Sequence, residues 1–166
     1  MIKSKRVPAE GAVAGPGLER LPHFRLGFTP PQGDELQSEF FVDRRDAPAA
    51  IRALRGLSPQ FVPLLLVNEV RTIAADDLWL SGAYGRDSVG LHFTWRRDED
   101  AVRALLPRVE DALAPYAARP HWGKVFTMAA ADIRARYPRF DDAVALRERL
   151  DPGGTFRNAF LAALGL

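Results

Sequence analysis

Apolar and polar residues alternate or cluster in four stretches of the chain, and this pattern predicts four β-strands. The expected strands cover residues 23–29, 36–42, 62–73 and 88–95. The turn-forming residues at 30–34 predict a hairpin between the first two of these strands. Residues 121–126, which are short and aromatic, could form a fifth strand or a loop.

Five other stretches have the residue spacing of helices. They cover residues 47–57, 98–113, 129–136, 141–150 and 158–164. Asp46 is expected to cap the first helix, and the acidic residues from Asp98 onward suit the positive end of the second. Pro107 could kink this second helix or end it early.

The order of these elements predicts the fold class. Two strand–strand–helix units are followed by further helices, which indicates an α+β fold: an antiparallel β-sheet, in a doubled ββα pattern, with helices packed on one face. Residues 1–20 contain three glycines and two prolines without an apolar period, and we interpret them as a flexible arm or former interdomain linker. Residues 21–166 are expected to form one domain, a length sufficient for a hydrophobic core.

The composition excludes several classes of protein. The chain of 166 residues has no cysteine, so disulfides, thiolate metal sites and cysteine nucleophiles are excluded. Its 23 basic and 21 acidic residues are interleaved, which argues against a nucleic-acid partner. No apolar run approaches the roughly 20 residues of a membrane helix, and no secretory signal is visible, so we expect no membrane association and a cytoplasmic location.

Strand periodicity brings four polar residues together. Side chains two residues apart share a face of a strand, so Glu69 lies with Arg71, and His92 lies with Thr94. The opposite face of the strand 88–95 is wholly apolar, as expected of a core. If both strands belong to one sheet, the four residues gather on the face without helices. Glu69 and Arg71 follow an apolar run and are therefore expected to lie deep, although a solvated face with an ion pair is the alternative interpretation.

Lys124 is a further candidate because lysine is rare in this chain. Only Lys3, Lys5 and Lys124 are lysines, whereas arginine supplies the other 20 basic residues. A lysine ammonium can donate a hydrogen bond to a single hydroxyl or alkoxide, although chance alone could also place it here. His92, His121 and Glu69 could bind zinc, but their spacing does not require it, and no metal site is predicted. No glycine-rich phosphate loop is present.

Several ordered motifs resemble the C-terminal part of bacterial alditol (xylitol) oxidases, in the sugar-1,4-lactone oxidase group of the vanillyl-alcohol-oxidase type of flavoproteins. The motifs are Glu19–Arg25, Glu35–Val42, Asn68–Thr72, Ala74–Ser81, Leu91–Trp95, Arg119–Lys124, Leu150–Pro152 and Phe156–Phe160. The resemblance implies a two-domain enzyme of more than twice this length, in which an N-terminal domain binds FAD and a C-terminal sheet covers the flavin and holds the polyol. The FAD-binding domain has no counterpart in this chain.

The resemblance also implies roles for individual residues. Arg71 and Lys124 correspond to catalytic positions, and Lys124 would contact the reacting hydroxyl. Glu69, Arg71, His92, Thr94 and Lys124 would bind substrate, whereas Glu69, Arg71 and His121 would lie close to the flavin.

The function expected from the resemblance is that of a substrate-binding domain of an FAD-dependent oxidase, which converts a primary polyol alcohol to an aldehyde and O2 to H2O2. The isolated chain is expected to be inactive without an FAD-binding domain or chain as its partner. The alternative is a non-catalytic sugar- or partner-binding module, or a truncated gene fragment that retains the fold. A homodimer is expected to form through the exposed sheet face.

Overall fold

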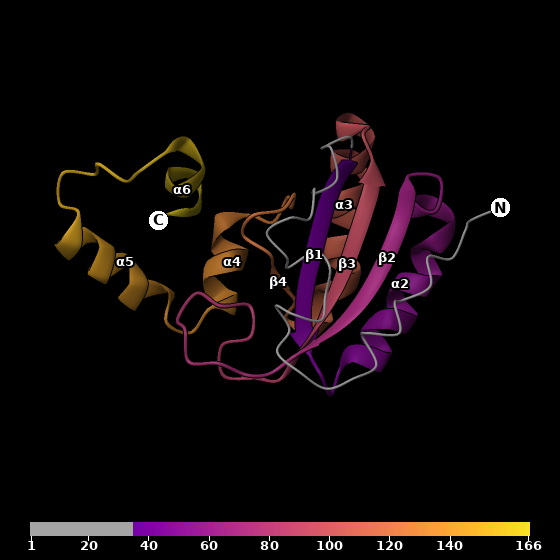
Figure 1. Ribbon diagram of the computed structural model, residues 1–166, viewed down its shortest axis with the longest axis horizontal. Helices are drawn as coiled ribbons and strands as arrows, with labels where there is room; N and C mark the ends of the chain where they lie inside the picture. The colour runs from indigo at the N-terminus through magenta and orange to yellow at the C-terminus, as the bar shows by residue number, and fades with distance from the viewer. Residues whose placement is uncertain (1–34) are drawn as a thin grey trace, which may run out of the picture. The chain divides into compact units, whose positions relative to one another are not determined.

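The computed structural model describes residues 35–166 (Figure 1). The predicted arm at residues 1–20, the strand at residues 23–29 and the hairpin that would join this strand to the next lie outside the described residues.

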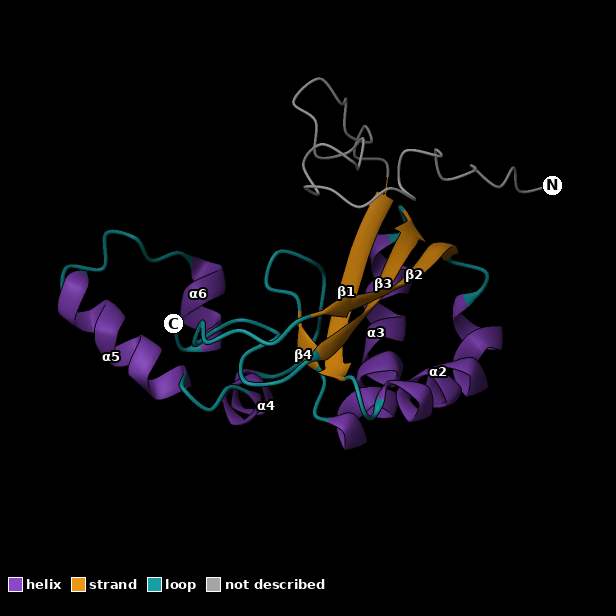
Figure 2. Ribbon diagram, turned by 60° about the horizontal axis from the view of Figure 1, so that its bottom comes forward, coloured by secondary structure: helices purple, strands orange, loops and turns teal. Residues whose placement is uncertain are grey.

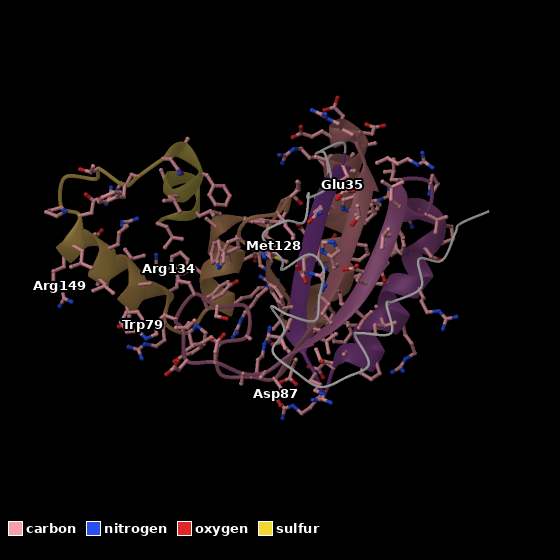
Figure 3. The ribbon with its side chains drawn as sticks, in the orientation of Figure 1. Glu35, Trp79, Asp87, Met128, Arg134 and Arg149 are labelled. Carbon is pink, nitrogen blue, oxygen red and sulfur yellow. The ribbon has the colours of Figure 1, made fainter. Side chains whose placement is uncertain are left out.

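Four strands form one antiparallel sheet in the described part of the chain. They are β1 (Glu35–Asp43), β2 (Leu65–Ile73), β3 (Ser88–Arg96) and the two-residue β4 (Arg119–Pro120). Their order across the sheet is β2-β3-β1-β4, and each neighbouring pair is antiparallel. Figure 3 shows this arrangement: Glu35, at the start of β1, and Asp87, just before β3, lie at opposite ends of the sheet. The predicted α+β fold is confirmed.

Two long helices cover one face of the sheet, with α3 behind β1 and β3 in Figure 1. They are α2 (Ala47–Phe61) and α3 (Glu99–Leu113), followed by a 3-10 turn (Ala114–Tyr116) and three shorter helices, α4 (Ala130–Arg136), α5 (Phe140–Leu150) and α6 (Ala159–Leu164). None of these described helices is long and apolar enough to cross a membrane.

The core lies between the sheet and the two long helices. The apolar face of β3 is buried here, as its alternation predicted: Val89, Leu91, Phe93 and Trp95. The rings of Phe93 and Trp95 stack in parallel, with their centroids 5.0 Å apart. The Trp95 indole donates a hydrogen bond to Ser38 Oγ at 3.1 Å, which ties β3 to β1 within the core.

The predicted end of α2, the predicted start of β2 and the predicted side-chain cap at Asp46 are wrong. Helix α2 continues to Phe61, so β2 begins at Leu65 rather than at residue 62. Asp46 precedes α2, but its side chain does not cap the helix, because Asp46 has helical backbone angles, whereas a side-chain cap forms from a residue with non-helical angles. Asp98, in contrast, caps α3 through the N–H of Ala101. Pro107 lies within α3 without ending it.

Residues 121–126 form a loop, which settles the open choice between a strand and a loop. After β4 the chain follows the edge of β1, and the backbone N–H groups of His121 and Val125 donate to the carbonyls of Glu39 and Gln37. Ser38 Oγ also donates to the Val125 carbonyl at 2.8 Å. This loop carries Lys124, and it is therefore held beside the sheet (Figure 2).

Candidate functional site

The polar residues of β2 and β3 share one face of the sheet, as strand periodicity predicted. Glu69 lies directly opposite His92 in the register of the two strands. Because the helices α2 and α3 cover the other face, this face is the one that the described helices leave open. His92 and Thr94 are buried in the middle of it.

Glu39 lies at the centre of this polar face. It is opposite His92 on the β1 side, so Glu69, His92 and Glu39 form a row across three strands. Sequence reasoning missed Glu39 as a site residue, although it shares a face of β1 with Gln37, opposite the buried Phe40 and Val42. This alternation was the signal that could have found it.

Lys124 enters the same cluster from the loop beside β1. Its Nζ lies 2.5 Å from Glu39 Oε2 and 2.9 Å from His92 Nδ1. The Lys124 side chain is 14% exposed and that of Glu39 is 4% exposed, so this ion pair is largely removed from water. The structure therefore brings together Lys124, His92 and Thr94, which the sequence analysis selected separately.

The lysine ammonium fixes the direction of the hydrogen bonds around His92. Because a charged Nζ has only protons to offer, His92 Nδ1 must accept, and the ring proton then resides on Nε2. His92 Nε2 lies 3.2 Å from Thr94 Oγ1, so it donates to this oxygen. The Thr94 hydroxyl proton remains free to point toward a ligand. Glu39 and His92 use two of the three lysine N–H donors, and no other residue of the described part of the chain is bonded to the third.

The charges in the cluster shift the ionisation of both buried partners. Burial raises the pKa of Glu39, but the Lys124 hydrogen bond and the charges of Lys124, Arg71 and His92 outweigh it, so the pKa lies below its usual value. Burial and the charges of Lys124 and Arg71 lower the pKa of His92. At neutral pH Glu39 is therefore a carboxylate and His92 a neutral imidazole.

Gly90 provides the space that the Glu39 side chain occupies. A Cβ atom at position 90 would lie 2.8 Å from Glu39 Oε1, closer than real Cβ atoms approach other atoms. Gly90 stands opposite Phe41 in the register of β1 and β3. A larger residue here would therefore displace the carboxylate from Lys124.

Glu69 and Arg71 form the outer rim of the cluster. They are paired with each other, and Arg71 Nη1 also lies 3.5 Å from Glu39 Oε1. Their side chains are 46% and 48% exposed, so the expectation that they lie deep is wrong. The reason is that β2 is the outermost strand on its side of the described sheet. The two residues can still meet a ligand that lies over the sheet.

His121 lies beside the cluster rather than in it. Its ring contacts Phe41, with the centroids 5.9 Å apart, and its Nδ1 accepts a hydrogen bond from the Gly123 N–H at 3.1 Å. Burial, followed by the charge of Lys124, lowers its pKa. His121 is therefore a neutral ring whose second nitrogen carries the proton.

A buried carboxyl anchors the far end of the loop that carries Lys124. Glu110 on α3 accepts hydrogen bonds from the Thr127 N–H and from Thr127 Oγ1, both at 2.6 Å. Burial raises the pKa of Glu110. The β1 edge and α3 thus hold the two sides of the loop, which fixes the position of Lys124 over the sheet.

The other polar features of the described residues lie apart from this cluster. A cavity of about 480 Å³ lies at the other end of β1, where Asp43, Arg45 and Arg86 are among its lining residues. Residues 35–166 contain no group of three His, Asp or Glu side chains placed to hold a metal ion. The predicted homodimer through the sheet face stays a prediction.

Glu39→Gln tests the charge balance of the cluster. Removing the carboxylate leaves the poorly exposed Lys124 ammonium without its anion, so the free energy of unfolding should fall by about 1–3 kcal/mol at pH 7. A group whose pKa is lowered by folding stabilises the fold above its unfolded pKa, here 4.5, and this stabilisation is lost as the pH falls through the folded pKa. Urea unfolding of both proteins between pH 7 and pH 3 measures the difference, which should shrink below pH 4.5. A difference in the free energy of unfolding that does not depend on pH would contradict the stabilising role of the Glu39 carboxylate.

Comparison with known proteins identifies the family. The profile of the D-arabinono-1,4-lactone oxidase family matches residues 34–164, and the chain belongs to this family. Its members are FAD-dependent flavoenzymes, as the resemblance of the sequence motifs indicated.

Individual relatives support the same assignment. The chain is 50% identical to an alditol oxidase of Streptomyces over 163 residues, which is 95% of this chain and 39% of the relative. It is 37% identical to an L-gulono-1,4-lactone dehydrogenase of Mycobacterium tuberculosis over 75% of this chain and 29% of the relative. It is 32% identical to an L-gulonolactone oxidase of Bos taurus over 70% of this chain and 27% of the relative. The chain thus spans well under half the length of these relatives.

The described residues fit only one end of FAD. A pyrophosphate is commonly bound by backbone N–H groups in a glycine loop between a strand and a helix, but the described glycines with left-handed backbone angles, Gly85, Gly154 and Gly165, do not lie in such a loop. The polar face, in contrast, carries the cationic hydrogen-bond donors Arg71 and Lys124. Such donors would stabilise a flavin ring that gains negative charge. The chemistry of these residues fits the reacting end of the cofactor.

Proposed function

We propose that this chain is the substrate-binding domain of an FAD-dependent alditol oxidase. The observation that carries the proposal is the Lys124–Glu39–His92–Thr94 cluster: a charged lysine with one unused donor, held by buried partners on the face that the described helices leave open. The 50% identity to an alditol oxidase supports a polyol as the substrate.

The cluster is suited to bind a polyol through its hydroxyl groups. A polyol hydroxyl both donates and accepts, and the cluster offers the remaining Lys124 donor and the Thr94 hydroxyl. Glu69 on the rim accepts from a second hydroxyl, and Arg71 donates to a third. A lone charge would bind any anion, whereas this alternation of donors and acceptors favours a chain of neutral hydroxyls.

Lys124 acts on the reacting hydroxyl. When bound, FAD would supply the acceptor for the hydride that leaves the alcohol carbon, and O2 would reoxidise it to give H2O2. As negative charge develops on the alcohol oxygen, the Lys124 ammonium stabilises it. Nζ first gives one of its protons to His92 Nδ1, 2.9 Å away, and the neutral amine that results then accepts the hydroxyl proton on the lone pair that this transfer leaves. The lowered pKa of His92 means that this nitrogen is free of a proton beforehand.

Glu39 stabilises Lys124 and His92 before and after the proton transfer. It accepts a hydrogen bond from Lys124 Nζ, and its Oε2 lies 3.6 Å from His92 Nδ1. When His92 takes up a proton, the nearby carboxylate stabilises the imidazolium. His121 and Arg71, at the edge of the cluster, would lie near the flavin.

A fused enzyme tests the proposal. The part of the Streptomyces alditol oxidase outside the matched region is joined to this chain, and H2O2 formation is measured with xylitol and with sorbitol. We expect the fused enzyme to bind FAD and form H2O2 with both polyols, whereas the lone chain should form none. A fused enzyme that binds FAD but forms no H2O2 from any polyol or sugar lactone would overturn the proposal and favour a module without catalytic function.

A further inference from the structure

Gln37 lies next to the polar cluster on the same face of the sheet. The cluster occupies a row across three strands, Glu69, His92 and Glu39. In the next row, toward the start of β1, Gln37 stands opposite Thr94. Because Gln37 and Glu39 are two positions apart on β1, their side chains share this face. The Gln37 side chain is therefore the neighbour of Thr94 on the β1 side.

The carboxamide of Gln37 has hydrogen-bonding groups that no described residue uses. Its Nε2 donates to Glu35 Oε1 at 3.0 Å. Since a carboxylate accepts hydrogen bonds and cannot donate them, this bond fixes the amide nitrogen, not the amide oxygen, toward Glu35. Within residues 35–166, neither Gln37 Oε1 nor the second N–H of the amide has a partner. Gln37 thus has one acceptor and one donor to offer beside the Thr94 hydroxyl.

The backbone at Gln37 is held against the loop that carries Lys124. The Gln37 carbonyl accepts from the N–H of Val125 at 2.8 Å. The next residue, Ser38, donates from Oγ to the Val125 carbonyl and accepts from the Trp95 indole. The Gln37 side chain is half-buried. A side chain that is already held in place loses less conformational freedom when it binds a ligand, so Gln37 is suited to a binding role.

Along β1, the polar face continues in one direction only. Toward the end of the strand, the next residue on this face is the apolar Phe41, whose ring lies so close to the Gly82 backbone that a Cβ atom there would overlap it. Toward the start of the strand, the next residues are Gln37 and Glu35, and Figure 3 labels Glu35 at this end of the sheet. A polyol at Lys124 therefore finds further polar side chains of β1 only toward Glu35.

The free groups of Gln37 suit a neutral hydroxyl. A hydroxyl group both donates and accepts, so it can bond to the amide oxygen and to the Thr94 hydroxyl at once. An anionic group is disfavoured here, because Glu35 and Glu39 flank Gln37 on the same face of β1. The chemistry of this position thus matches that of an alditol, which carries a hydroxyl on every carbon.

We propose that Gln37 binds a hydroxyl group at the far end of the polyol and so selects longer alditols over short ones. This inference rests on the proposed function, because it concerns the same bound polyol. Lys124 Nζ bonds to Glu39, one row away from Gln37. Rows on one face of a strand are about 6.6 Å apart, which the chain of xylitol or sorbitol can span and the short chain of glycerol cannot.

Gln37→Leu in the fused enzyme tests this proposal. The substitution keeps a side chain of similar size and removes both hydrogen-bonding groups. We expect kcat/KM for xylitol and sorbitol to fall by about threefold to tenfold, the usual effect of losing one neutral hydrogen bond, and kcat/KM for glycerol to change by less than about twofold. The measurement is the initial rate of H2O2 formation with each alcohol.

Gln60→Leu is the matched control. Gln60 lies on α2, on the other side of the sheet, and its exposed amide accepts from Arg108 Nη1. Its loss should leave kcat/KM for all three alcohols unchanged. Flavin absorbance and circular dichroism establish that each variant is loaded and folded. If Gln37→Leu does not fold, Gln37→Met takes its place and is judged by the same criterion.

The ratio of kcat/KM for xylitol to that for glycerol decides the outcome. A residue that only supports the fold would lower both values together, so an unchanged ratio in a folded Gln37→Leu enzyme would overturn the proposal. A larger loss with glycerol than with xylitol would also overturn it, because it would place Gln37 at the reacting end of the polyol. An unsubstituted fused enzyme that oxidises no polyol would refute the proposed function as well, whereas these two results refute the role of Gln37 alone.

Discussion

Lys124→Met should lower the kcat of the fused enzyme with xylitol by about a hundredfold to ten-thousandfold, the usual range for the loss of a group that assists proton transfer. Methionine keeps much of the length of the side chain but removes the ammonium that contacts Glu39 and His92. The alcohol oxygen then loses its charged hydrogen-bond donor, and the proton loses its route to His92. The measurement is the initial rate of H2O2 formation over a range of xylitol concentrations.

Arg103→Met is the matched control for this substitution. Arg103 is an exposed cation on α3, on the other side of the sheet, and its partner is Glu99 in the same helix. Its loss should change kcat by less than twofold, since surface ion pairs contribute little. Flavin absorbance and circular dichroism establish that both variants are loaded and folded. A Lys124→Met enzyme with folded structure, bound FAD and unchanged kcat would contradict the role given to Lys124.

Trp95→Ala should lower the free energy of unfolding of the lone chain by about 3–5 kcal/mol. Trp95 is fully buried, stacks on Phe93 and donates to Ser38 Oγ. The substitution removes the largest side chain of the core and leaves a cavity between β3 and the helices. Ser38 also bonds the Val125 carbonyl, so the loop that carries Lys124 should loosen as well. Urea unfolding followed by circular dichroism measures the loss.

Two further variants separate the contributions at this position. Trp95→Phe keeps a ring for stacking and removes the indole N–H, so it should cost less than Trp95→Ala. Leu78→Ala, at a side chain that is 65% exposed, should change the free energy of unfolding by less than about 0.5 kcal/mol. A Trp95→Ala protein as stable as the Leu78→Ala protein would show that the core does not lie where the structure places it.

Strand periodicity predicted most of the polar face. The two-residue repeat is a property of the extended backbone, so the partition of β3 into an apolar and a polar face needs no knowledge of its neighbours. For this reason His92 and Thr94 were correctly placed opposite Trp95. The order of the strands in the sheet could not be predicted in this way, because it depends on contacts between residues that are distant in the sequence. Without the order β2-β3-β1-β4, nothing in the sequence placed Glu39 beside His92 or made β2 an edge strand.

Composition selected Lys124 as a candidate site residue, but it could not predict where this residue lies in the fold. Its rarity as a lysine selected it, but its position depends on the loop that bonds along β1 to the carbonyls of Glu39 and Gln37. These are contacts between residues more than 80 positions apart in the sequence, and no local pattern encodes them. The end of α2 was missed for a related reason: the apolar residues at 61–65 suit a helix end and a strand equally well, and packing decides between them.

The position of a bound polyol tests the central claim most directly. A crystal structure of the fused enzyme with xylitol should show one hydroxyl oxygen within about 3.2 Å of Lys124 Nζ and another within the same distance of Thr94 Oγ1. Xylitol bound elsewhere, for example in the cavity beside Asp43 and Arg86, with Lys124 still paired only to Glu39 and His92, would contradict the account.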